Sequence, residues 1–509
     1  MTDAAAPALD QTAGLLLGQS SDNGVARREY LLWNRANRHG VIAGATGTGK
    51  TVTLQIMAQG FSDMGVPVFC ADVKGDLSGI SQIGTPNEKL LARATGMGLT
   101  LRPLAAPTVF WDLYGQKGHP VRATVSEIGP LLMARMLDLN DVQEGVLAVA
   151  FHVADKEGLL LLGLDDLRAM LVYVAENAAR IGREVGNVAP ASIASIQRAL
   201  LQLEQDGGDA FFGEPALKLT DMMKTGVDGR GQVNVLDSTR LMNSPRLYGA
   251  FLLWLISELF EQLPEVGDPE KPRLVFFFDE AHLLFKDAPR PLLEKVEQVV
   301  RLIRSKGVGI YFITQNPADI PDSVLAQLGN RIQHALRAYT PADQRGLKAA
   351  SESFRINPAF DTREAIQALG TGEALVSVLD EKGAPTIVQR TLIRPPDSRL
   401  GPATDPERAA VMAASPVRGV YDTVIDRESA EEILAARHAA ETAAEAPAPG
   451  ATPGGRAAPA PRAAPAPRAP RRSNRQTPLE ALTKSVLRTA GSTLTRELLR
   501  GVLGGLKRR

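Results

Sequence analysis

The residues best suited to chemistry form one run, Gly44-Ala45-Thr46-Gly47-Thr48-Gly49-Lys50-Thr51, followed directly by Val52. The run fits the pattern G-x-x-x-x-G-K-[ST] at every fixed position. Glycines let such a loop curl so that backbone N–H groups point at phosphate oxygens, beside the positive end of a helix. We expect Lys50 to reach the β- and γ-phosphates, and the Thr51 hydroxyl to join a magnesium shell. The run, Val52 included, therefore predicts a site for ATP and Mg²⁺.

A second group of candidates follows the apolar run Leu274-Val275-Phe276-Phe277-Phe278, which ends in Asp279 and Glu280. This pattern predicts a buried strand that carries carboxylates at its C-terminal end, where open α/β sheets bind ligands. We expect Asp279 to hold magnesium through water and Glu280 to polarise the attacking water. Hydrophobic residues before an acid are a weak signal alone, but a phosphate loop requires such a metal partner. His282 either couples the nucleotide state to a partner or makes an ordinary polar contact.

A third apolar run, residues 307–314, ends in Gln315. If its strand is a neighbour of the strand that carries Glu280, the two side chains lie side by side. Gln315 then senses the γ-phosphate or holds the attacking water. The alternative is that Gln315 only caps its own loop with hydrogen bonds.

Short apolar strands must position these residues, and they alternate with longer helical patterns from about residue 14 to 400, as in an α/β domain. Residues of about 120–225 have helical periodicity, which predicts a helical insertion within the nucleotide-binding fold. Two further runs around the turn-like Asp380-Glu381-Lys382-Gly383 predict a hairpin. The strands are predicted at 40–44, 67–72, 107–112, 232–237, 273–279 and 308–314, and the hairpin at 373–379 and 386–393.

Beyond residue 400 the composition changes. We expect a helical extension at 401–442 and a disordered Ala/Pro/Arg-rich linker at 443–476, because that composition cannot bury a core. Apolar residues then recur at four-residue steps and predict a basic amphipathic helix at 477–509. They are Leu482, Val486, Ala490, Leu494, Leu498 and Val502.

Bulk properties set limits on function. Lys plus Arg and Asp plus Glu both number 57, so global charge argues neither for nor against nucleic acid. The single cysteine, Cys70, excludes an intrachain disulfide or a multi-cysteine metal site, and its apolar surroundings predict a core residue. The N-terminus lacks the pattern of a secretory signal, and every apolar stretch is too short to span a bilayer. We therefore expect a cytoplasmic protein.

Several of these segments together resemble the HerA/FtsK superfamily. The resemblance is carried by Asn37-Arg38-His39-Gly40, the phosphate loop, Ala71-Asp72-Val73-Lys74-Gly75-Asp76, Asp279-Glu280-Ala281-His282 and Thr314-Gln315. From Ser244 to Phe285 the chain is similar nearly throughout to the bacterial YjgR-type group of HerA-like proteins. The resemblance covers about residues 14–400 and the terminal basic helix. It implies a RecA-like ATPase that forms a homo-oligomeric ring of the hexameric type. It also implies a helicase-like activity in which this ring translocates DNA.

The resemblance also implies a residue that acts on a neighbouring subunit. In HerA-like motors an arginine just before the third strand crosses to the neighbour's nucleotide, and Arg304 matches that position. A guanidinium supplied in trans stabilises the charge of phosphoryl transfer. Arg331 and Arg337 are rival candidates. Two differences limit what the resemblance implies. Only about 40 residues precede the loop, where HerA has a β-barrel. The sequence also shows neither the membrane spans nor the winged helix that FtsK has.

The expected cargo depends on the C-terminal tail, which has thirteen Lys or Arg residues from Arg456 onward against only Glu480 and Glu497. A basic tail binds DNA backbones without sequence preference, binds an anionic membrane surface, or docks on protein. Because the tail has no aromatic residues, we do not expect base stacking there. The turn at Lys74-Gly75-Asp76 or the inserted region would line a ring's pore. The alternative function is an ATP-driven protein- or membrane-associated machine without DNA translocation.

Overall fold

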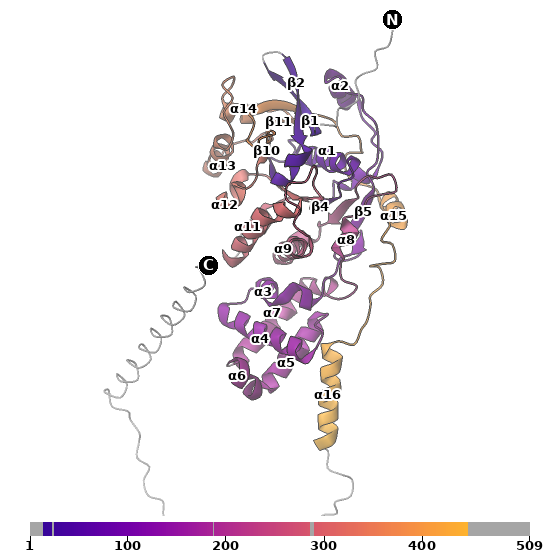
Figure 1. Cartoon of the computed structure of the whole chain (residues 1–509), viewed down its shortest axis with the longest axis vertical. Coiled ribbons are helices and arrows are strands. Elements are labelled where there is room, and N and C mark those ends of the chain that lie inside the picture. Colours follow the sequence, from indigo (N-terminus) through magenta and orange to yellow (C-terminus); the bar gives the residue numbers. More distant parts are fainter. Residues whose placement is uncertain (1–13, 23–24, 187, 286–289, 446–509) are drawn as a thin grey trace, which may run out of the picture. The chain divides into compact units, whose positions relative to one another are not determined.

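The computed structural model describes residues 14–22, 25–186, 188–285 and 290–445 (Figure 1). The predicted basic helix at 477–509, and the linker from residue 446 on, lie outside the described residues. Within the described part, no helix has the length and apolarity needed to cross a bilayer.

One twelve-stranded sheet organises the described residues. Its strand order is β2-β1-β12-β11-β10-β3-β9-β8-β4-β7-β5-β6. The strands from β10 to β6 in this order pair in parallel, whereas β2, β1, β12, β11 and β10 pair antiparallel. The bounds are β1 Gly14–Asp22, β2 Val25–Leu32, β3 Gly40–Ala43, β4 Val68–Asp72, β5 Thr108–Asp112, β6 His119–Pro120, β7 Val233–Asp237, β8 Leu274–Phe278, β9 Val308–Thr314, β10 Asn330–Gln333, β11 Glu373–Ser377 and β12 Gln389–Ile393.

Every strand named from the sequence is present, and β11 and β12 pair as the expected antiparallel hairpin. The sequence reading missed β1, β2, β6 and β10. A register shift between Leu16 and Gly18 interrupts the two-residue alternation of β1. In β10 the sequence Asn-Arg-Ile-Gln is short and polar, although three of its four residues are buried. In both β1 and β10, packing against the rest of the fold makes the segment a strand, although the local sequence pattern does not predict one.

Alternating side chains of the central strands feed two apolar cores, one on each face of the sheet. Phe276 and Phe278 of β8 belong to one core, and Phe277 belongs to the other with Cys70 of β4. Cys70 is fully buried, which confirms it as a core residue. Helix α1 (Lys50–Asp63) packs in the second core, and α9 (Pro245–Gln262) and α11 (Arg290–Ile303) pack in the first. Burial on both faces explains why these strands read as continuous apolar runs.

The chain between β6 and β7 is helical and joins the core on the α9 side of the sheet. Figure 1 shows α3, α4, α5, α6 and α7 of this segment grouped together, with α16 alongside α5. The boundaries of the domains stay predictions. The elements are α3 Val125–Met136, α4 Asp141–Glu157, α5 Leu164–Glu176, α6 Ala178–Val185, α7 Pro190–Gln205 and α8 Leu219–Met222, and elsewhere α2 Glu88–Gly96, α10 His282–Phe285, α12 Asp322–Leu325, α13 Pro341–Glu352, α14 Thr362–Ala368, α15 Asp405–Ala413 and α16 Ala430–Glu445.

Candidate nucleotide site

The glycine-rich loop joins β3 to α1 at the C-terminal ends of the parallel strands. It is anchored on both sides, because Gly44 N donates to Thr314 O (3.2 Å) and Ala45 N donates to Ala335 O (2.8 Å). Gly49 has a φ of +119°, which a residue with a side chain rarely adopts. At Gly44 an added Cβ would lie 2.6 Å from the Cβ of His334. The loop therefore needs glycine for both its curl and its close packing.

Lys50 is buried at the start of α1 and folds back over the loop. Its Nζ donates to the carbonyl oxygens of Gly44 (2.6 Å) and Ala45 (3.1 Å). Burial lowers the pKa of Lys50 and the charge of Lys74 adds to this, while Glu280 and Asp279 oppose it. A buried ammonium group has lost contact with water, so it is well suited to form charge-assisted hydrogen bonds with phosphate oxygens.

Asp279 follows β8 directly and is 9% exposed. Its Oδ1 accepts a hydrogen bond from Glu280 N at 2.9 Å. Burial raises the pKa of Asp279 to about 6, although the charge of Lys74 acts in the opposite direction. The Thr51 hydroxyl lies on the same side and donates to Asp76 Oδ2 at 3.4 Å.

Glu280 is held by residues that directly follow the two neighbouring strands, β4 and β9. Gln315 Nε2 donates to its two carboxylate oxygens at 3.2 and 3.3 Å, and Lys74 Nζ lies 2.8 Å from Oε1. His282 Nδ1 lies 3.3 Å from Oε2. Burial would raise the pKa of Glu280, but the hydrogen bond and charge of Lys74, followed by Gln315, hold it below its usual value. The residue is 3% exposed and has a φ of +48°, so the backbone is strained where the carboxylate is placed.

The structure thus brings together Lys50, Thr51, Asp279, Glu280 and Gln315, as the order of the strands requires. Arg304 lies elsewhere in its own chain, before the start of β9, at the end opposite to Thr314. Its guanidinium pairs with Asp268 at 3.3 Å, and Arg38 pairs with the same carboxylate at 2.8 Å.

The two rival arginines differ. Arg331 donates to the backbone carbonyls of Leu328, Ser353 and Leu325, so its guanidinium supports the local fold. Arg337 is exposed.

Sequence reasoning missed two residues at the site. The Lys74-Gly75-Asp76 turn was one of two candidates for lining a pore, which stays a prediction, and the structure shows that its Lys74 contacts Glu280. Only the pairing of β4 with β8 could have revealed this contact. His334 lies under the loop, where its Nε2 is 2.9 Å from the Thr53 hydroxyl and burial lowers its pKa to about 4. No local sequence signal marks it.

The oxygen donors at the site suit Mg²⁺. They are the Thr51 hydroxyl and the carboxylates of Asp279 and Asp76, and Mg²⁺ binds through one or two carboxylates with phosphates and water completing its shell. Across the described ranges, no group of three or more His, Cys, Asp or Glu residues forms a metal cage of its own. The donor set therefore fits a metal that arrives with a nucleotide.

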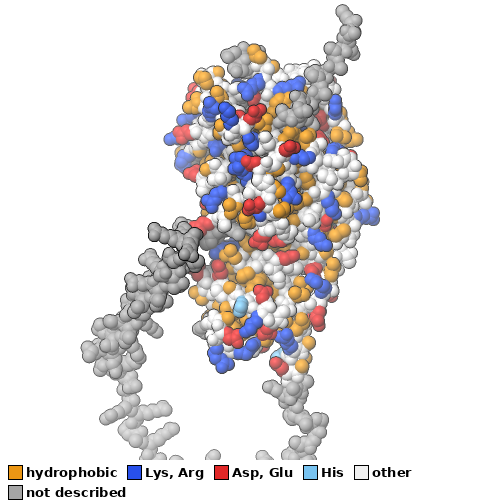
Figure 2. All heavy atoms as spheres, viewed as in Figure 1, with side chains coloured by type: hydrophobic (Ala, Val, Ile, Leu, Met, Phe, Trp, Pro, Cys, Tyr) orange, Lys and Arg blue, Asp and Glu red, His pale blue; other side chains and the backbone are white. Residues whose placement is uncertain are grey.

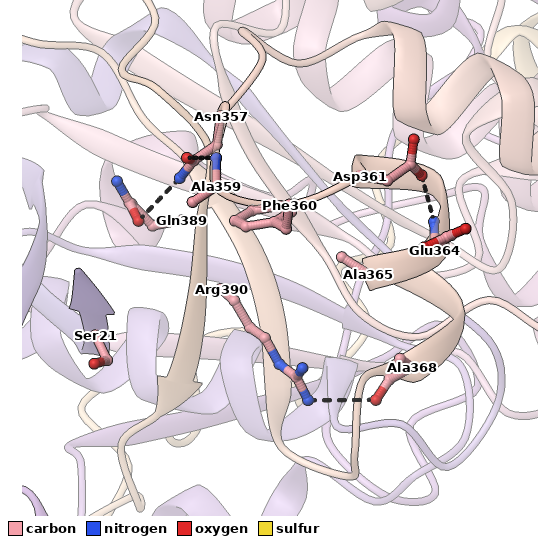
Figure 3. Close-up of a pocket in the computed structure, with 10 residues that line it drawn as sticks. All are labelled: Ser21, Asn357, Ala359, Phe360, Asp361, Glu364, Ala365, Ala368, Gln389 and Arg390. Atoms are coloured by element: carbon pink, nitrogen blue, oxygen red, sulfur yellow. Dashed lines mark hydrogen bonds between the residues drawn. The ribbon is translucent and has the colours of Figure 1, made fainter. Parts of the chain in front are cut away.

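Several cavities lie outside the loop itself, and two of them are compared with the site. One of about 610 Å³ is lined by His282 and Gln315, the partners of Glu280, and by Phe285 and Asp319. Another of about 500 Å³ lies between β12 and α14 (Figure 3), where Asn357 contacts Gln389 and Arg390 donates to Ala368 O. The second cavity includes none of the predicted site residues.

The chain is also similar to a known protein family. A family model described as "Helicase HerA-like C-terminal" matches residues 18–509. The chain belongs to this HerA-like family. A DNA double-strand break repair helicase HerA from Sulfolobus acidocaldarius is 20% identical over 347 residues, which are 67% of this chain and 63% of that protein. A probable helicase of Methanocaldococcus jannaschii is 28% identical over 155 residues, which are 28% of each chain.

The HerA-like chain thus spans less than two thirds of the length of these relatives. Among solved structures, VirB4 of Thermoanaerobacter pseudethanolicus superposes with a TM-score of 0.50 and 16% sequence identity. The match covers 79% of this chain and 100% of that one. At this identity the likeness concerns the fold.

Proposed function

We propose that the chain is a Mg²⁺-dependent ATPase that works as an oligomeric ring and translocates DNA. One observation carries the ATPase assignment. Glu280, the residue able to orient a water molecule, is held just after β8 between residues that directly follow β4 and β9, at the end of the strands that carries the phosphate loop. A carboxylate fixed in this way has the placement that hydrolysis of a terminal phosphate requires.

Each residue has a distinct part in the proposed reaction. Backbone N–H groups of the loop and the Lys50 ammonium bind the phosphates, and Thr51 and Asp279 hold the metal. Bound Mg²⁺ would neutralise charge on the phosphate oxygens. Glu280 orients and polarises the attacking water, and Gln315 keeps the carboxylate in place. Because these groups are fixed before the reaction, little reorganisation is needed during it.

A distance within the fold supports the proposed ring. Arg304 precedes β9, and the loop contacts the far end of the same strand, so the seven residues of β9 separate them by roughly 20 Å. The arginine is therefore far from the nucleotide of its own subunit, and it lies beside a second arginine, Arg38, on Asp268. We propose that Arg304 acts on a neighbour's nucleotide in a closed, hexameric ring.

DNA is the proposed cargo, and the support comes from relatives and from the basic tail. The Sulfolobus relative is named as a DNA repair helicase. On the face of the described residues in Figure 2, Lys and Arg side chains are interspersed with Asp and Glu. From Arg456 onward the tail has thirteen basic residues against two acidic ones, which makes it a strongly basic segment. A cytoplasmic location, where DNA and ATP are available, belongs to the same proposal.

The test is the steady-state ATPase rate with and without double-stranded DNA across a salt series. The full-length chain would be compared with a chain ending at Glu445. We expect stimulation that weakens with salt, and that is lost on truncation, because contacts to phosphates release counterions. A rate that ignores DNA but rises with anionic vesicles, or with a protein partner, would replace translocation by the alternative machine. No ATP hydrolysis at all would overturn the ATPase.

A further inference from the structure

The turn that follows β4 carries a lysine into the nucleotide site. Because β4 and β8 pair in parallel with Ala71 opposite Phe278, the residues after the two strands emerge side by side. On the other side of β8, Phe278 lies opposite Phe312 of β9. Glu280 therefore sits between the tips of two strands, with Lys74 from one and Gln315 from the other.

The turn itself is fixed, so Lys74 does not reach Glu280 by chance rotation of a loose loop. Asp72 accepts hydrogen bonds from Gly75 N at 2.8 Å and from Leu77 N at 3.1 Å. Gly75 has a φ of +75°, which a glycine adopts without strain. These bonds aim the root of the Lys74 side chain at Glu280.

The contact is asymmetric in exposure. The side chain of Lys74 is 37% exposed, whereas that of Glu280 is 4% exposed, and 2.8 Å separate Nζ from Oε1. A buried carboxylate with a strained backbone has few ways to fix its own orientation, and a charge-assisted hydrogen bond is directional. Gln315 donates to both carboxylate oxygens of Glu280 from one nitrogen atom. This shared hydrogen bond defines the rotation of the carboxylate about its terminal C–C bond less well than a hydrogen bond to one oxygen does.

We propose that Lys74 is a positioning residue of the hydrolytic site, whose ammonium group fixes the Glu280 carboxylate in the orientation that aligns the attacking water. The proposal rests on the ATPase function proposed above. Lys74 acts through Glu280 and needs no part in binding the nucleotide. Its loss should therefore change turnover and leave nucleotide affinity in place.

The chain offers a matched control. Lys117 Nζ lies 3.4 Å from Asp237 Oδ2 at the tip of β7, the strand next to β4. Asp237 is as buried as Glu280, with a side chain 5% exposed. Lys117→Met thus removes the same charge from a similar pair at a neighbouring strand tip, away from Glu280.

The first experiment measures kcat and KM for ATP in Lys74→Met, Lys74→Arg and Lys117→Met, with ADP affinity from equilibrium titration. We expect Lys74→Met to lower kcat by roughly tenfold to a hundredfold, the cost of misplacing a reacting group. KM and ADP affinity should stay within about twofold of wild type, Lys74→Arg should recover part of kcat, and Lys117→Met should match wild type. An unchanged or raised kcat in Lys74→Met, or an equal loss in Lys117→Met, would overturn the proposal.

The second experiment reads the contact without any turnover. Urea unfolding of nucleotide-free wild type, Lys74→Met, Glu280→Gln and the double variant forms a double-mutant cycle. We expect Lys74→Met to destabilise the wild type more than it destabilises Glu280→Gln, since the partner charge is then already absent. Additive effects would show that Lys74 does not hold Glu280. A wild type without ATP hydrolysis would end the proposed function, whereas this cycle would still report on the contact.

Discussion

The two ends of the parallel strands carry different polar groups. At the C-terminal ends lie Lys50, Lys74, Asp279, Glu280 and Gln315, which contact loop carbonyls or one another. At the opposite end, before β3 and β9, two arginines share the single carboxylate of Asp268. One end gathers the groups proposed to bind the nucleotide and its metal, whereas the other end presents positive charge outward, with Arg304 39% exposed. This separation is the basis of the proposal that Arg304 of one chain completes the site of a second copy.

The largest effect should come from the end with the arginines. Arg304→Ala is expected to lower kcat by about a thousandfold, the range for an arginine supplied in trans. Mixing it with Glu280→Gln chains should restore part of the activity, because some interfaces then combine an intact Glu280 with an intact Arg304. Steady-state ATPase across mixing ratios measures this. A mixture no more active than its components would exclude Arg304 as a simple trans residue.

At the nucleotide end, Glu280→Gln should lower kcat by about a hundredfold or more, because the amide cannot accept a proton from water. ATP affinity should change little, since Lys50 and the loop are untouched. Stopped-flow binding of a fluorescent ATP analogue, with single-turnover hydrolysis, separates the two quantities. Hydrolysis at the wild-type rate would remove Glu280 from its assigned part.

His39 lies at the end of the sheet that carries the arginines, and the pH dependence of stability tests its surroundings. Burial, with smaller contributions from the charges of Arg304 and Arg38, lowers its pKa to about 4, so the imidazole is neutral in the fold at neutral pH. In the unfolded chain a histidine is protonated below about pH 6.5. Between about pH 6.5 and pH 4 the unfolded state therefore binds more protons than the native state, and the free energy of unfolding decreases as the pH falls. We expect wild type to lose about 1.4 kcal/mol per pH unit in this window relative to His39→Asn.

The side-chain oxygen of Asn can accept the hydrogen bond that Ile310 N donates to His39 Nδ1. Urea unfolding at pH 7 and pH 5 measures the difference between the two chains. Buried carboxylates with raised pKa values, such as Asp63 and Asp72, titrate in both and cancel. Equal pH dependence in the two chains would contradict a buried neutral His39.

The smallest effect should come from a residue that supports the loop without a part in the reaction. Arg93 donates to the carbonyl oxygens of Thr371 and Gly372, and Gly372 N donates to Thr48 O within the loop. Arg93→Ala should raise KM about fivefold, the equivalent of one hydrogen bond of ~1 kcal/mol, with kcat unchanged. Arg180→Ala in the helical insertion serves as the control. A fall in kcat would place Arg93 closer to the chemistry than proposed.

Prediction from sequence succeeded where the signal is local. The loop fits a fixed spacing, and the run 274–278 is apolar because β8 is buried on both faces. The adjacency of Gln315 and Glu280 was expected only on the condition that β8 and β9 pair, which they do. The contact of Lys74 with Glu280 depends on β4 lying on the other side of β8, and strand order leaves no mark in the local sequence. The parts assigned to the site residues stay predictions.

The pairing of β1 with β12 has a consequence for how the chain is made. Gly18 lies opposite Ile393, so the first described strand completes its hydrogen bonds only with a strand roughly 375 residues later. During synthesis one edge of the β1–β2 hairpin stays unpaired until β12 has been made. The chain between β1 and β12 is a long loop, and contacts that close a long loop form slowly. An exposed strand edge is a template for aggregation. Chains cut before β12 should therefore accumulate as insoluble protein, whereas a chain ending at Glu445 retains the strand that closes this edge.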